Sequence, residues 1–286
     1  MLVSIVCSKQ TIAAMVLITW AFVLLTATAA TAFQPPSNFI IGGENASIHV
    51  YPSAAQIEWK SFLDDEWILI CGSTILNERW LLTAAHCFVP FFVGIERSRI
   101  RAGSSLRGEG GQVVHLKSFI VHPGYGVAAP HDSDLALVEL ERPLTWSDAV
   151  RPAAIYAFGT EVPDDSAVQV VGWGDTVGDS LESSSGNYAS TLQEVTLFTE
   201  NTEECKMIYE GEEVVTDNMI CAGSQGVGDK DACAGDSGGP VYYADRGTDV
   251  LVGVTSWGPQ PCGNPVQPGV FVKVSAFTRW ILSNVV

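Results

Sequence analysis

The sequence predicts an all-β protein, an antiparallel sandwich or barrel, and three observations support this class. Short runs of apolar residues, or of alternating apolar and polar residues, recur along the chain and are rich in Val and Ile. They are separated by the turn-forming residues Gly, Pro, Asp and Ser. No internal repeat, heptad or low-complexity tract is present. The chain has 286 residues, 47% hydrophobic and only 16% charged, so it can bury a sizeable core and is not of the disordered class.

Seven runs have the length and composition of β-strands, at residues 67–76, 79–85, 110–122, 134–140, 166–174, 249–258 and 269–274. Polar stretches over 147–165 and 175–190 indicate loops, and the first is a candidate boundary between two β-units. The last segment differs from the strands. A short amphipathic helix is predicted over Ser275–Val286 by apolar residues at helical spacing, namely Phe277, Trp280, Ile281 and Val285.

The first 32 residues have the organisation of a secretory signal peptide. Lys9 precedes the uncharged run Thr11–Leu25, and small residues follow up to Ala32. The alternative is a signal anchor, because the uncharged stretch is just long enough to span a bilayer. The small residues at its end favour cleavage, after Ala29 or Ala32. We therefore predict a signal peptide over 1–32 and a secreted, extracellular protein that is not held in a membrane.

The mature chain would keep six of the seven cysteines. An even number in a secreted chain indicates three disulfides, with 15 possible pairings. Loss of Lys9 leaves 14 basic residues against 32 acidic ones, a formal charge of −18. This acidic balance argues against a sequence-independent nucleic-acid binder and against binding to an anionic membrane surface, so neither is expected as a partner. It favours solubility and the attraction of basic ligands.

A candidate for chemistry is the serine in Gly235-Asp236-Ser237-Gly238-Gly239. Glycines let the backbone turn tightly against a substrate, and adjacent N–H groups at such a turn can form an oxyanion hole. Taken alone, this pattern is more often a plain Gly-Ser turn. It also matches the nucleophile elbow of α/β-hydrolases, in which the histidine follows the serine. That class is excluded because all the histidines precede Ser237: His49, His86, His115, His122 and His131.

The order that remains along the chain is histidine, aspartate, serine. His86 lies in Thr-Ala-Ala-His-Cys, and Asp134 begins Asp-Leu-Ala-Leu. With Ser237 in Gly-Asp-Ser-Gly-Gly-Pro and matching cysteines, these segments resemble the trypsin-like (chymotrypsin-family) serine peptidases over about residues 40–286. The resemblance implies two antiparallel six-stranded β-barrels with a short C-terminal α-helix, and a peptidase domain over 40–286.

The resemblance also implies roles for the matching residues. Ser237 would be the nucleophile, His86 the general base and then acid, and Asp134 the group that orients the imidazole. The N–H groups of Gly235 and Ser237 would hold the oxyanion. Singly, His86 and Asp134 could each be ordinary core residues. Asp132 is the nearest alternative to Asp134, but the apolar strand residues follow Asp134. The implied disulfides are Cys71–Cys87, Cys205–Cys221 and Cys233–Cys262.

Asp231, six residues before Ser237, corresponds to the floor of the family's primary pocket. A buried carboxylate is costly unless paired, so this pocket would favour a substrate Arg or Lys. Ala232, next to Asp231, has no hydroxyl group. A substrate Lys depends on such an additional partner more than a substrate Arg, whose guanidinium binds the carboxylate with two hydrogen bonds, so we expect Arg to be preferred over Lys. The other implied pocket residues are Ser256, which would hydrogen-bond Asp134, and Trp257, Gly258 and Gly269.

Ile40-Ile41-Gly42-Gly43 matches the family's mature N-terminus, with residues 33–39 as the propeptide. The new ammonium of Ile40 would pair with buried Asp236 and assemble the pocket. Here the sequence departs from the family pattern. Phe39 stands before the cut where most trypsin precursors carry Arg or Lys. We therefore expect activation by a chymotrypsin-like peptidase and not by the enzyme itself.

No metal or other cofactor is predicted, because the loop at 101–109 is short and partly basic where calcium-binding relatives carry a longer acidic loop. The expected partners are polypeptide substrates, above all basic ones, and protein protease inhibitors, with the enzyme acting as a monomer. Two alternatives stay open. One is a serine peptidase of different primary specificity, and the other is a catalytically silent homologue that serves as a binding module.

Overall fold

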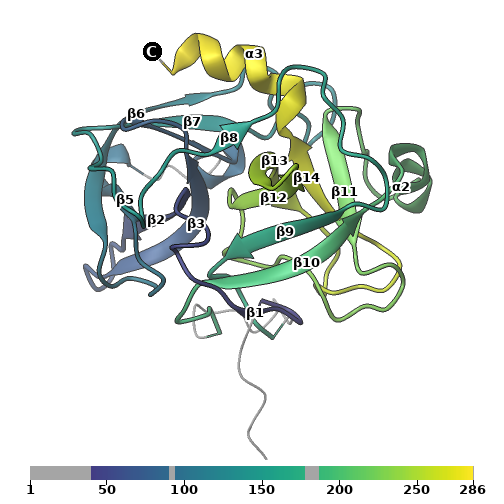
Figure 1. Ribbon diagram of the computed structural model, residues 1–286, viewed down its shortest axis with the longest axis horizontal. Coiled ribbons are helices and arrows are strands. Elements are labelled where there is room, and N and C mark those ends of the chain that lie inside the picture. The colour runs from purple at the N-terminus through teal and green to yellow at the C-terminus, as the bar shows by residue number, and fades with distance from the viewer. Residues whose placement is uncertain (1–39, 90–93, 178–186, 286) are drawn as a thin grey trace, which may run out of the picture. The chain divides into compact units, whose positions relative to one another are not determined.

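The computed structural model describes residues 40–89, 94–177 and 187–285, which all belong to one unit, Asn38–Val286. The predicted signal peptide and propeptide lie outside these residues. Strands dominate the described chain and form two closed barrels (Figure 1).

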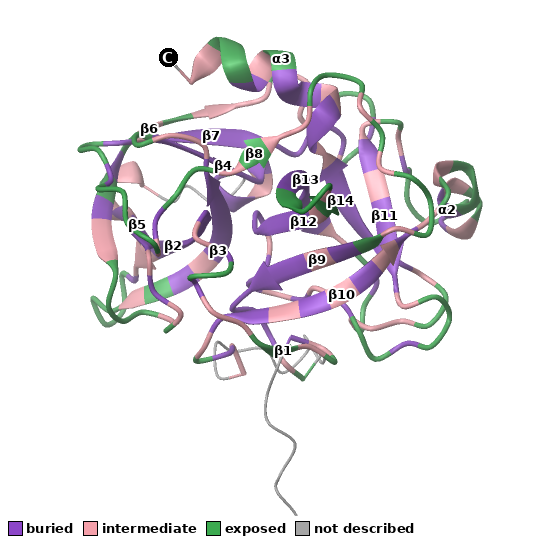
Figure 2. Cartoon of the chain, viewed as in Figure 1, coloured by how far each residue is buried: buried purple, intermediate pink, exposed green. Residues whose placement is uncertain are grey.

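The first barrel closes in the order β2-β3-β4-β7-β6-β5, and every pairing in it is antiparallel. Its interior is filled by aliphatic side chains, among them the fully buried Ile57, Leu82 and Leu137. Figure 2 shows the burial along these strands. The strands are β2 (Ala54–Lys60), β3 (Trp67–Ile75), β4 (Trp80–Thr83), β5 (Ser98–Ala102), β6 (Gln112–Val121) and β7 (Ala136–Leu140).

The second barrel closes in the order β9-β10-β11-β14-β13-β12, with β12 pairing back to β9, again antiparallel throughout. Two short strands attach to its outside: β1 (Glu44–Asn45) pairs with β10, and β8 (Ala154–Ile155) runs parallel to β13. The barrel strands are β9 (Ala167–Gly172), β10 (Gln193–Thr199), β11 (Met219–Gly223), β12 (Pro240–Asp245), β13 (Thr248–Trp257) and β14 (Gly269–Lys273). The fold therefore has the two six-stranded barrels that the resemblance implies.

Two α-helices complete the described chain. The predicted C-terminal helix is α3 (Val274–Asn284), which begins one residue before and ends two residues before the predicted bounds. Helix α2 (Thr202–Ile208) was not predicted from the sequence, and its N-terminus is capped by the Asn201 side chain. Two 3₁₀ turns, η1 (Ala85–Cys87) and η2 (Ile95–Arg97), lie in the first barrel. None of the helices in the described ranges is long and apolar enough to cross a bilayer.

The barrels are joined by packing and hydrogen bonds. The rings of Tyr51 and Tyr242 stack with centroids 5.5 Å apart, and Ser53 Oγ lies 2.7 Å from the Tyr242 hydroxyl oxygen. Helix α3 follows the last strand of the second barrel but packs Phe277 and Trp280 edge-on against His122, which follows β6 of the first. The two barrels are thus held in a fixed relation, and the loops between them are positioned by both.

Ion pairs that were not predicted from the sequence lie on β2 and β5 of the first barrel, on the face opposite the core residues Ile57 and Ile100. Buried Glu58 on β2 accepts from Arg101 Nε at 2.6 Å and from Arg99 Nε at 2.5 Å, both on the neighbouring strand β5. The Arg99 guanidinium also lies 3.8 Å from the centroid of the Trp67 ring. The segment expected as a loop over 101–109 therefore begins inside strand β5. Its first arginine is a buried ion-pair partner, not a solvated loop residue.

Replacing Glu58 by Gln should lower the free energy of unfolding by about 3 kcal/mol, because two guanidinium groups with little solvent lose their counter-charge. The matched control is Asp148→Asn, which breaks an exposed ion pair with Arg151 and should leave stability unchanged. Urea unfolding at pH 7 measures both variants. Equal effects of the two substitutions would contradict the role given to Glu58.

Candidate active site

The three residues of the predicted triad come from both barrels and meet between them. His86 lies in η1 directly after β4, and Asp134 lies two residues before β7, both in the first barrel. Ser237 lies three residues before β12 in the second barrel. Because each residue stands close to the end of a barrel strand, a rigid scaffold positions each of the three side chains.

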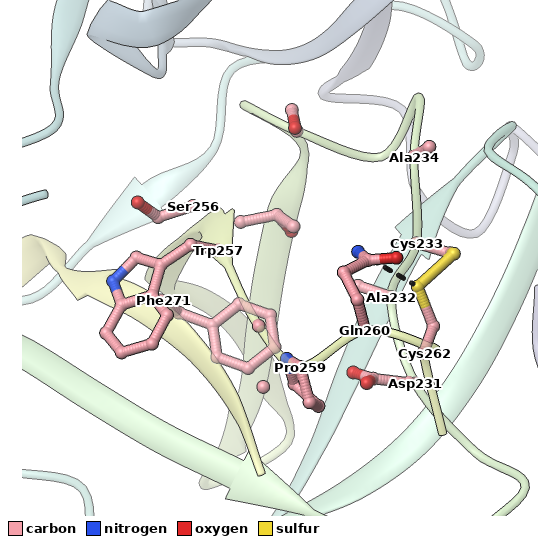
Figure 3. Close-up of a pocket in the computed structure, with 14 residues that line it drawn as sticks. Asp231, Ala232, Cys233, Ala234, Ser256, Trp257, Pro259, Gln260, Cys262 and Phe271 are labelled. Carbon is pink, nitrogen blue, oxygen red and sulfur yellow. Dashed lines mark hydrogen bonds between the residues drawn. A yellow bond between two sulfur atoms is a disulfide. The ribbon is translucent and has the colours of Figure 1, made fainter. Parts of the chain in front are cut away.

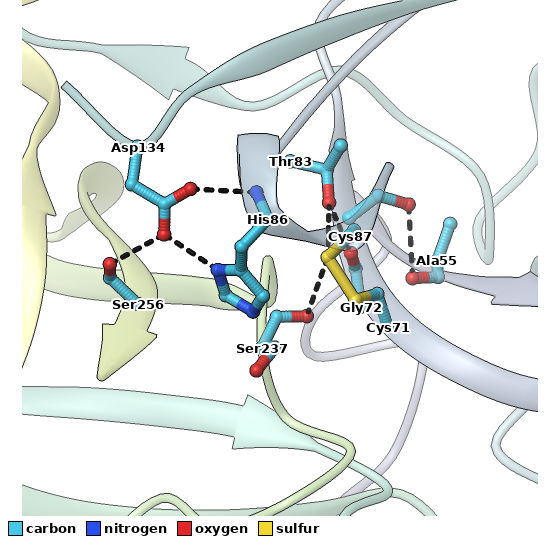
Figure 4. The surroundings of a disulfide bond; sticks show 10 residues. Ala55, Cys71, Gly72, Thr83, His86, Cys87, Asp134, Ser237 and Ser256 are labelled. Atoms are coloured by element: carbon cyan, nitrogen blue, oxygen red, sulfur yellow. Dashed lines mark hydrogen bonds and ion pairs between the residues drawn. A yellow bond between two sulfur atoms is a disulfide. The ribbon is translucent and has the colours of Figure 1, made fainter. Parts of the chain in front are cut away.

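His86 and Asp134 are joined by two hydrogen bonds. The imidazole Nδ1 lies 2.6 Å from Asp134 Oδ2, and the backbone N–H of His86 donates to Asp134 Oδ1 at 2.9 Å. The Ser256 hydroxyl on β13 donates to Oδ2 at 2.6 Å. Figure 4 shows the imidazole ring between Asp134 and Ser237. The second ring nitrogen is thus left facing the serine.

Asp134 is completely buried, and burial alone would raise the pKa of its carboxyl group. The hydrogen bond and charge of His86, followed by the Ser256 hydroxyl, more than offset burial and hold the pKa below its ordinary value. Asp134 is therefore an anion at neutral pH. A buried carboxylate of this kind fixes the orientation of the imidazole and stabilises its cationic form.

The backbone around Ser237 is fixed from both sides. The Ser237 carbonyl accepts from the N–H of Gly72 at 2.8 Å, and the N–H of Gly238 donates to Thr255 at 2.8 Å. Gly235 has φ 93°, and a Cβ there would lie 2.9 Å from the Tyr188 ring, so glycine is required. In the described part of the chain, the N–H groups of Gly235 and Ser237 have no acceptor. They are available to hold an anionic oxygen.

A pocket of about 120 Å³ opens next to Ser237 and contains Asp231 (Figure 3). The Asp231 side chain is buried and accepts from the N–H of Gly263 at 3.0 Å. Burial raises the pKa of Asp231 to about 6, although backbone hydrogen bonds from Gly263 and Ala232 lower it. Among the described residues, no Lys or Arg lies within ion-pair distance of this carboxylate. Its negative charge is left for a ligand.

All the other residues predicted for the pocket line it. A Cβ on Gly269 would lie 2.8 Å from Asp231 Oδ1, and a Cβ on Gly258 would meet only the Gly269 Cα at 3.5 Å. Both glycines therefore keep space open for a long ligand side chain. The Trp257 ring stacks on His131 with centroids 5.4 Å apart. Sequence reasoning missed several lining residues, including Pro259, Gln260 and Phe271, because no motif marks them.

The pair predicted for activation, Ile40 and Asp236, is completely buried. The Ile40 side chain packs in the core of the second barrel, and Asp236 accepts from the N–H groups of Gly174 at 2.7 Å and Cys233 at 3.1 Å. Burial raises the pKa of Asp236 to about 7, and the charge of Asp231 adds to the rise. The carbonyl of Ile41 accepts from the N–H of Asp231 at 3.2 Å, so the N-terminal segment touches the pocket floor.

Three disulfides are present: Cys71–Cys87, Cys205–Cys221 and Cys233–Cys262, the pairs that the resemblance implies. The first holds the segment of His86, and the third closes the wall of the Asp231 pocket. Among the described residues, one group of three candidate metal ligands lies together, Cys71, His86 and Cys87. Two of its members are bonded to each other as a disulfide, so this group does not offer a metal its ligands.

Two closed six-stranded antiparallel barrels with these loops between them define the chymotrypsin-like fold. The family model described as Trypsin matches residues 40–281. Similar proteins include Trypsin of Phaedon cochleariae, 36% identical over 86% of this chain and 88% of the relative. Trypsin CFT-1 of Choristoneura fumiferana is 34% identical over 93% of this chain and 99% of the relative. Trypsin, alkaline B of Manduca sexta is 35% identical over 86% of this chain and 90% of the relative. The chain belongs to the trypsin family of serine endopeptidases.

Proposed function

We propose that this protein is a secreted serine endopeptidase that hydrolyses peptide bonds after Arg or Lys, and that it is made as a precursor cleaved before Ile40. The observation that carries the specificity is Asp231, a buried carboxylate at a pocket beside Ser237 with no cation of its own among the described residues. His86, Asp134 and Ser237 supply the chemistry.

Acylation begins with a substrate whose basic side chain enters the Asp231 pocket. The Ser237 hydroxyl attacks the scissile carbonyl carbon while the free ring nitrogen of His86 takes its proton. The Asp134 carboxylate, already bonded to Nδ1, stabilises the imidazolium that forms. The negative charge that develops on the carbonyl oxygen is held by the N–H groups of Gly235 and Ser237.

Collapse of this intermediate breaks the peptide bond, and His86 gives its proton to the leaving amine. The substrate's acyl half stays bonded to Ser237 as an ester. A water molecule then attacks the ester, with His86 again taking and returning the proton, which releases the acid and restores the serine. The cycle uses only these side chains, the two N–H groups, the substrate and water.

Specificity follows from the cost of the unpaired Asp231 charge. A guanidinium group satisfies a buried carboxylate with two parallel hydrogen bonds, whereas an apolar side chain leaves it desolvated and unpaired. Ala232 contributes no hydroxyl to assist a shorter ammonium group. Arg is therefore the preferred residue before the scissile bond, and Lys the second.

The predicted signal peptide indicates where the enzyme acts, and its net negative charge indicates which substrates it attracts. The signal peptide over 1–32 sends the chain to the extracellular space, where the three disulfides persist. The acidic balance attracts basic polypeptide substrates in a salt-dependent way. The mature enzyme acts as a monomer and is a target for protein protease inhibitors that occupy the same pocket.

Activation rests on the buried Asp236. Its carboxyl group is completely buried, and burial together with the charge of Asp231 raises its pKa. Cleavage between Phe39 and Ile40 creates an ammonium group that pairs with this carboxylate. Phe39 suits a chymotrypsin-like activating peptidase, so the mature enzyme, which cuts after Arg or Lys, does not activate its own precursor.

The specificity prediction uses the enzyme matured at Ile40 and peptides that differ only before the scissile bond. Arg should exceed Phe, Leu and Ala in kcat/KM by at least about a hundredfold, with Lys between, because an unpaired buried charge costs several kcal/mol. Ser237→Ala serves as the inactive blank. Asp231→Ser should remove most of the Arg advantage. If the peptide with the highest kcat/KM carries an apolar residue before the scissile bond, the alternative specificity is supported. If no peptide is cleaved, the binding-module alternative is supported.

The pH prediction uses matched substrates with Arg or its uncharged isostere citrulline before the scissile bond. The ratio of their kcat/KM values should be constant above pH 7 and fall about tenfold per pH unit below about 6, because Asp231 is charged above its raised pKa and neutral below it. Any titration of the triad affects both substrates and cancels in the ratio. A ratio that stays flat from pH 5 to 8 would contradict the assignment of Asp231.

The activation prediction compares the precursor with a Phe39→Arg variant. Chymotrypsin should activate the natural precursor and trypsin should not, whereas the variant should respond to trypsin and to the mature enzyme itself. N-terminal sequencing of the product should begin at Ile40. Rapid activation of the natural precursor by its own mature form would contradict the prediction.

A further inference from the structure

A second buried carboxylate lies next to the candidate triad, and the proposed mechanism does not use it. Asp132 stands two residues before Asp134 and is only 3% exposed. In the described part of the chain, no Lys or Arg forms an ion pair with Asp132. A buried carboxylate without a cation must be stabilised by hydrogen bonds, so its partners show what it holds in place.

The Asp132 carboxylate joins the two barrels. Its Oδ1 accepts from the Thr216 hydroxyl at 2.5 Å and from Asn218 Nδ2 at 3.0 Å. Both donors lie in the segment before β11 of the second barrel, and Asn218 immediately precedes that strand. Asn218 is itself fixed, because its carbonyl accepts from the N–H of Lys273, the last residue of β14, at 2.8 Å. The carboxylate is thus anchored to two neighbouring strands of the second barrel.

The other carboxylate oxygen holds the residue between the two aspartates. The Ser133 hydroxyl donates to Asp132 Oδ2 at 2.8 Å. Ser133 has φ 54°, a left-handed conformation that is unfavourable for a residue with a Cβ. The N–H of Leu135 donates to the Ser133 carbonyl at 2.7 Å, which closes a tight turn around Asp134. Strained backbone of this kind persists only where the surrounding structure holds it.

The turn is therefore attached to the second barrel at two points. The Asp134 carboxylate accepts from the Ser256 hydroxyl on β13 (Figure 4), and Asp132 is bonded beside β11. Strands β11 and β13 both pair with β14, so the two points are one strand apart in the same sheet. One hydrogen bond fixes a position but leaves a rotation free. Two separated points also fix the direction in which the Asp134 side chain leaves the turn.

We infer that Asp132 is a positioning residue of the peptidase, whose three hydrogen bonds hold the strained turn that aims Asp134 at His86. The inference rests on the proposed function, in which Asp134 orients the imidazole. Asp132 does not line the Asp231 pocket, so it acts on the chemical step and not on the binding of the basic side chain. A small displacement of the Asp134 carboxylate would slow that step, because proton transfer requires the imidazole to be held in a narrow range of orientations.

The test measures kcat and KM of the mature enzyme on an amide substrate with Arg before the scissile bond. Asp132→Ala should lower kcat at least about tenfold and change KM by less than about twofold, because the turn relaxes while the Asp231 pocket is unchanged. Asp132→Asn should restore kcat to within about threefold of wild type. The amide keeps one oxygen for the two donors of the second barrel and can donate to Ser133, so it restores the hydrogen bonds without the charge.

Thr216→Val tests the same link from the second barrel. It removes one hydroxyl with little change of shape, and Thr216 does not line the Asp231 pocket. It should lower kcat about threefold, and the double variant with Asp132→Ala should be no slower than Asp132→Ala alone, since both remove one connection. The matched control is Ser53→Ala, which removes another buried hydrogen bond between the barrels, to Tyr242. It should lower the unfolding temperature and leave kcat unchanged.

The outcomes separate the two proposals. If the wild-type enzyme does not cleave the substrate, the proposed function fails and the inference fails with it. If it does, but Asp132→Ala keeps its kcat or changes only KM, Asp132 has no positioning role and the inference alone is overturned. A loss in Asp132→Asn as large as that in Asp132→Ala would also overturn it, because the negative charge and not the hydrogen bonds would then matter. Thermal unfolding verifies that each variant is folded, and the milder Thr216→Val decides the question if Asp132→Ala does not fold.

Discussion

The arrangement of the two barrels depends on how the buried charge of Asp134 is satisfied. Its carboxylate has no contact with water, and an unpaired buried anion costs several kcal/mol. Two of its hydrogen bonds come from His86 in the first barrel and the third comes from Ser256 in the second. The anion is therefore stable only where the barrels meet in this register. That register also places Ser237 beside the imidazole.

The sequence predicts best the strands that lie within long apolar runs. Apolar runs mark β3, β7 and β13, and all three are strands in the structure. Five barrel strands were not predicted: β2, β5, β10, β11 and β12. For β2 and β5 the reason is the charged residues on one face, Glu58, Arg99 and Arg101, which form ion pairs across the two strands. Read alone, each segment is too polar for a core strand. Only the ion pairs between the two strands offset the free-energy cost of burying these charged side chains.

The same reasoning applies to the candidate site. Short motifs mark Ser237, His86 and Asp231, because in the proposed function a nucleophile, a base and a charged pocket floor each need a definite residue type at a definite spacing. Other residues that line the Asp231 pocket, among them Pro259, Gln260 and Phe271, need only a suitable size and shape. Such a requirement leaves no motif in the sequence. These residues are recognised only when the fold brings them together around Asp231.

Asp231 and Asp236 lie five residues apart, both are buried, and neither has a cation among the described residues. After burial itself, the charge of Asp231 contributes to the raised pKa of Asp236, so charging either carboxylate is harder while the other is charged. In the proposed function each aspartate receives a cation from outside, the ammonium of Ile40 or the guanidinium of a substrate. A cation at one site then removes part of the cost of charging the other. Binding at the two sites is thermodynamically reciprocal, so cleavage of the precursor strengthens substrate binding, and a bound basic residue stabilises the inserted N-terminus by the same free energy.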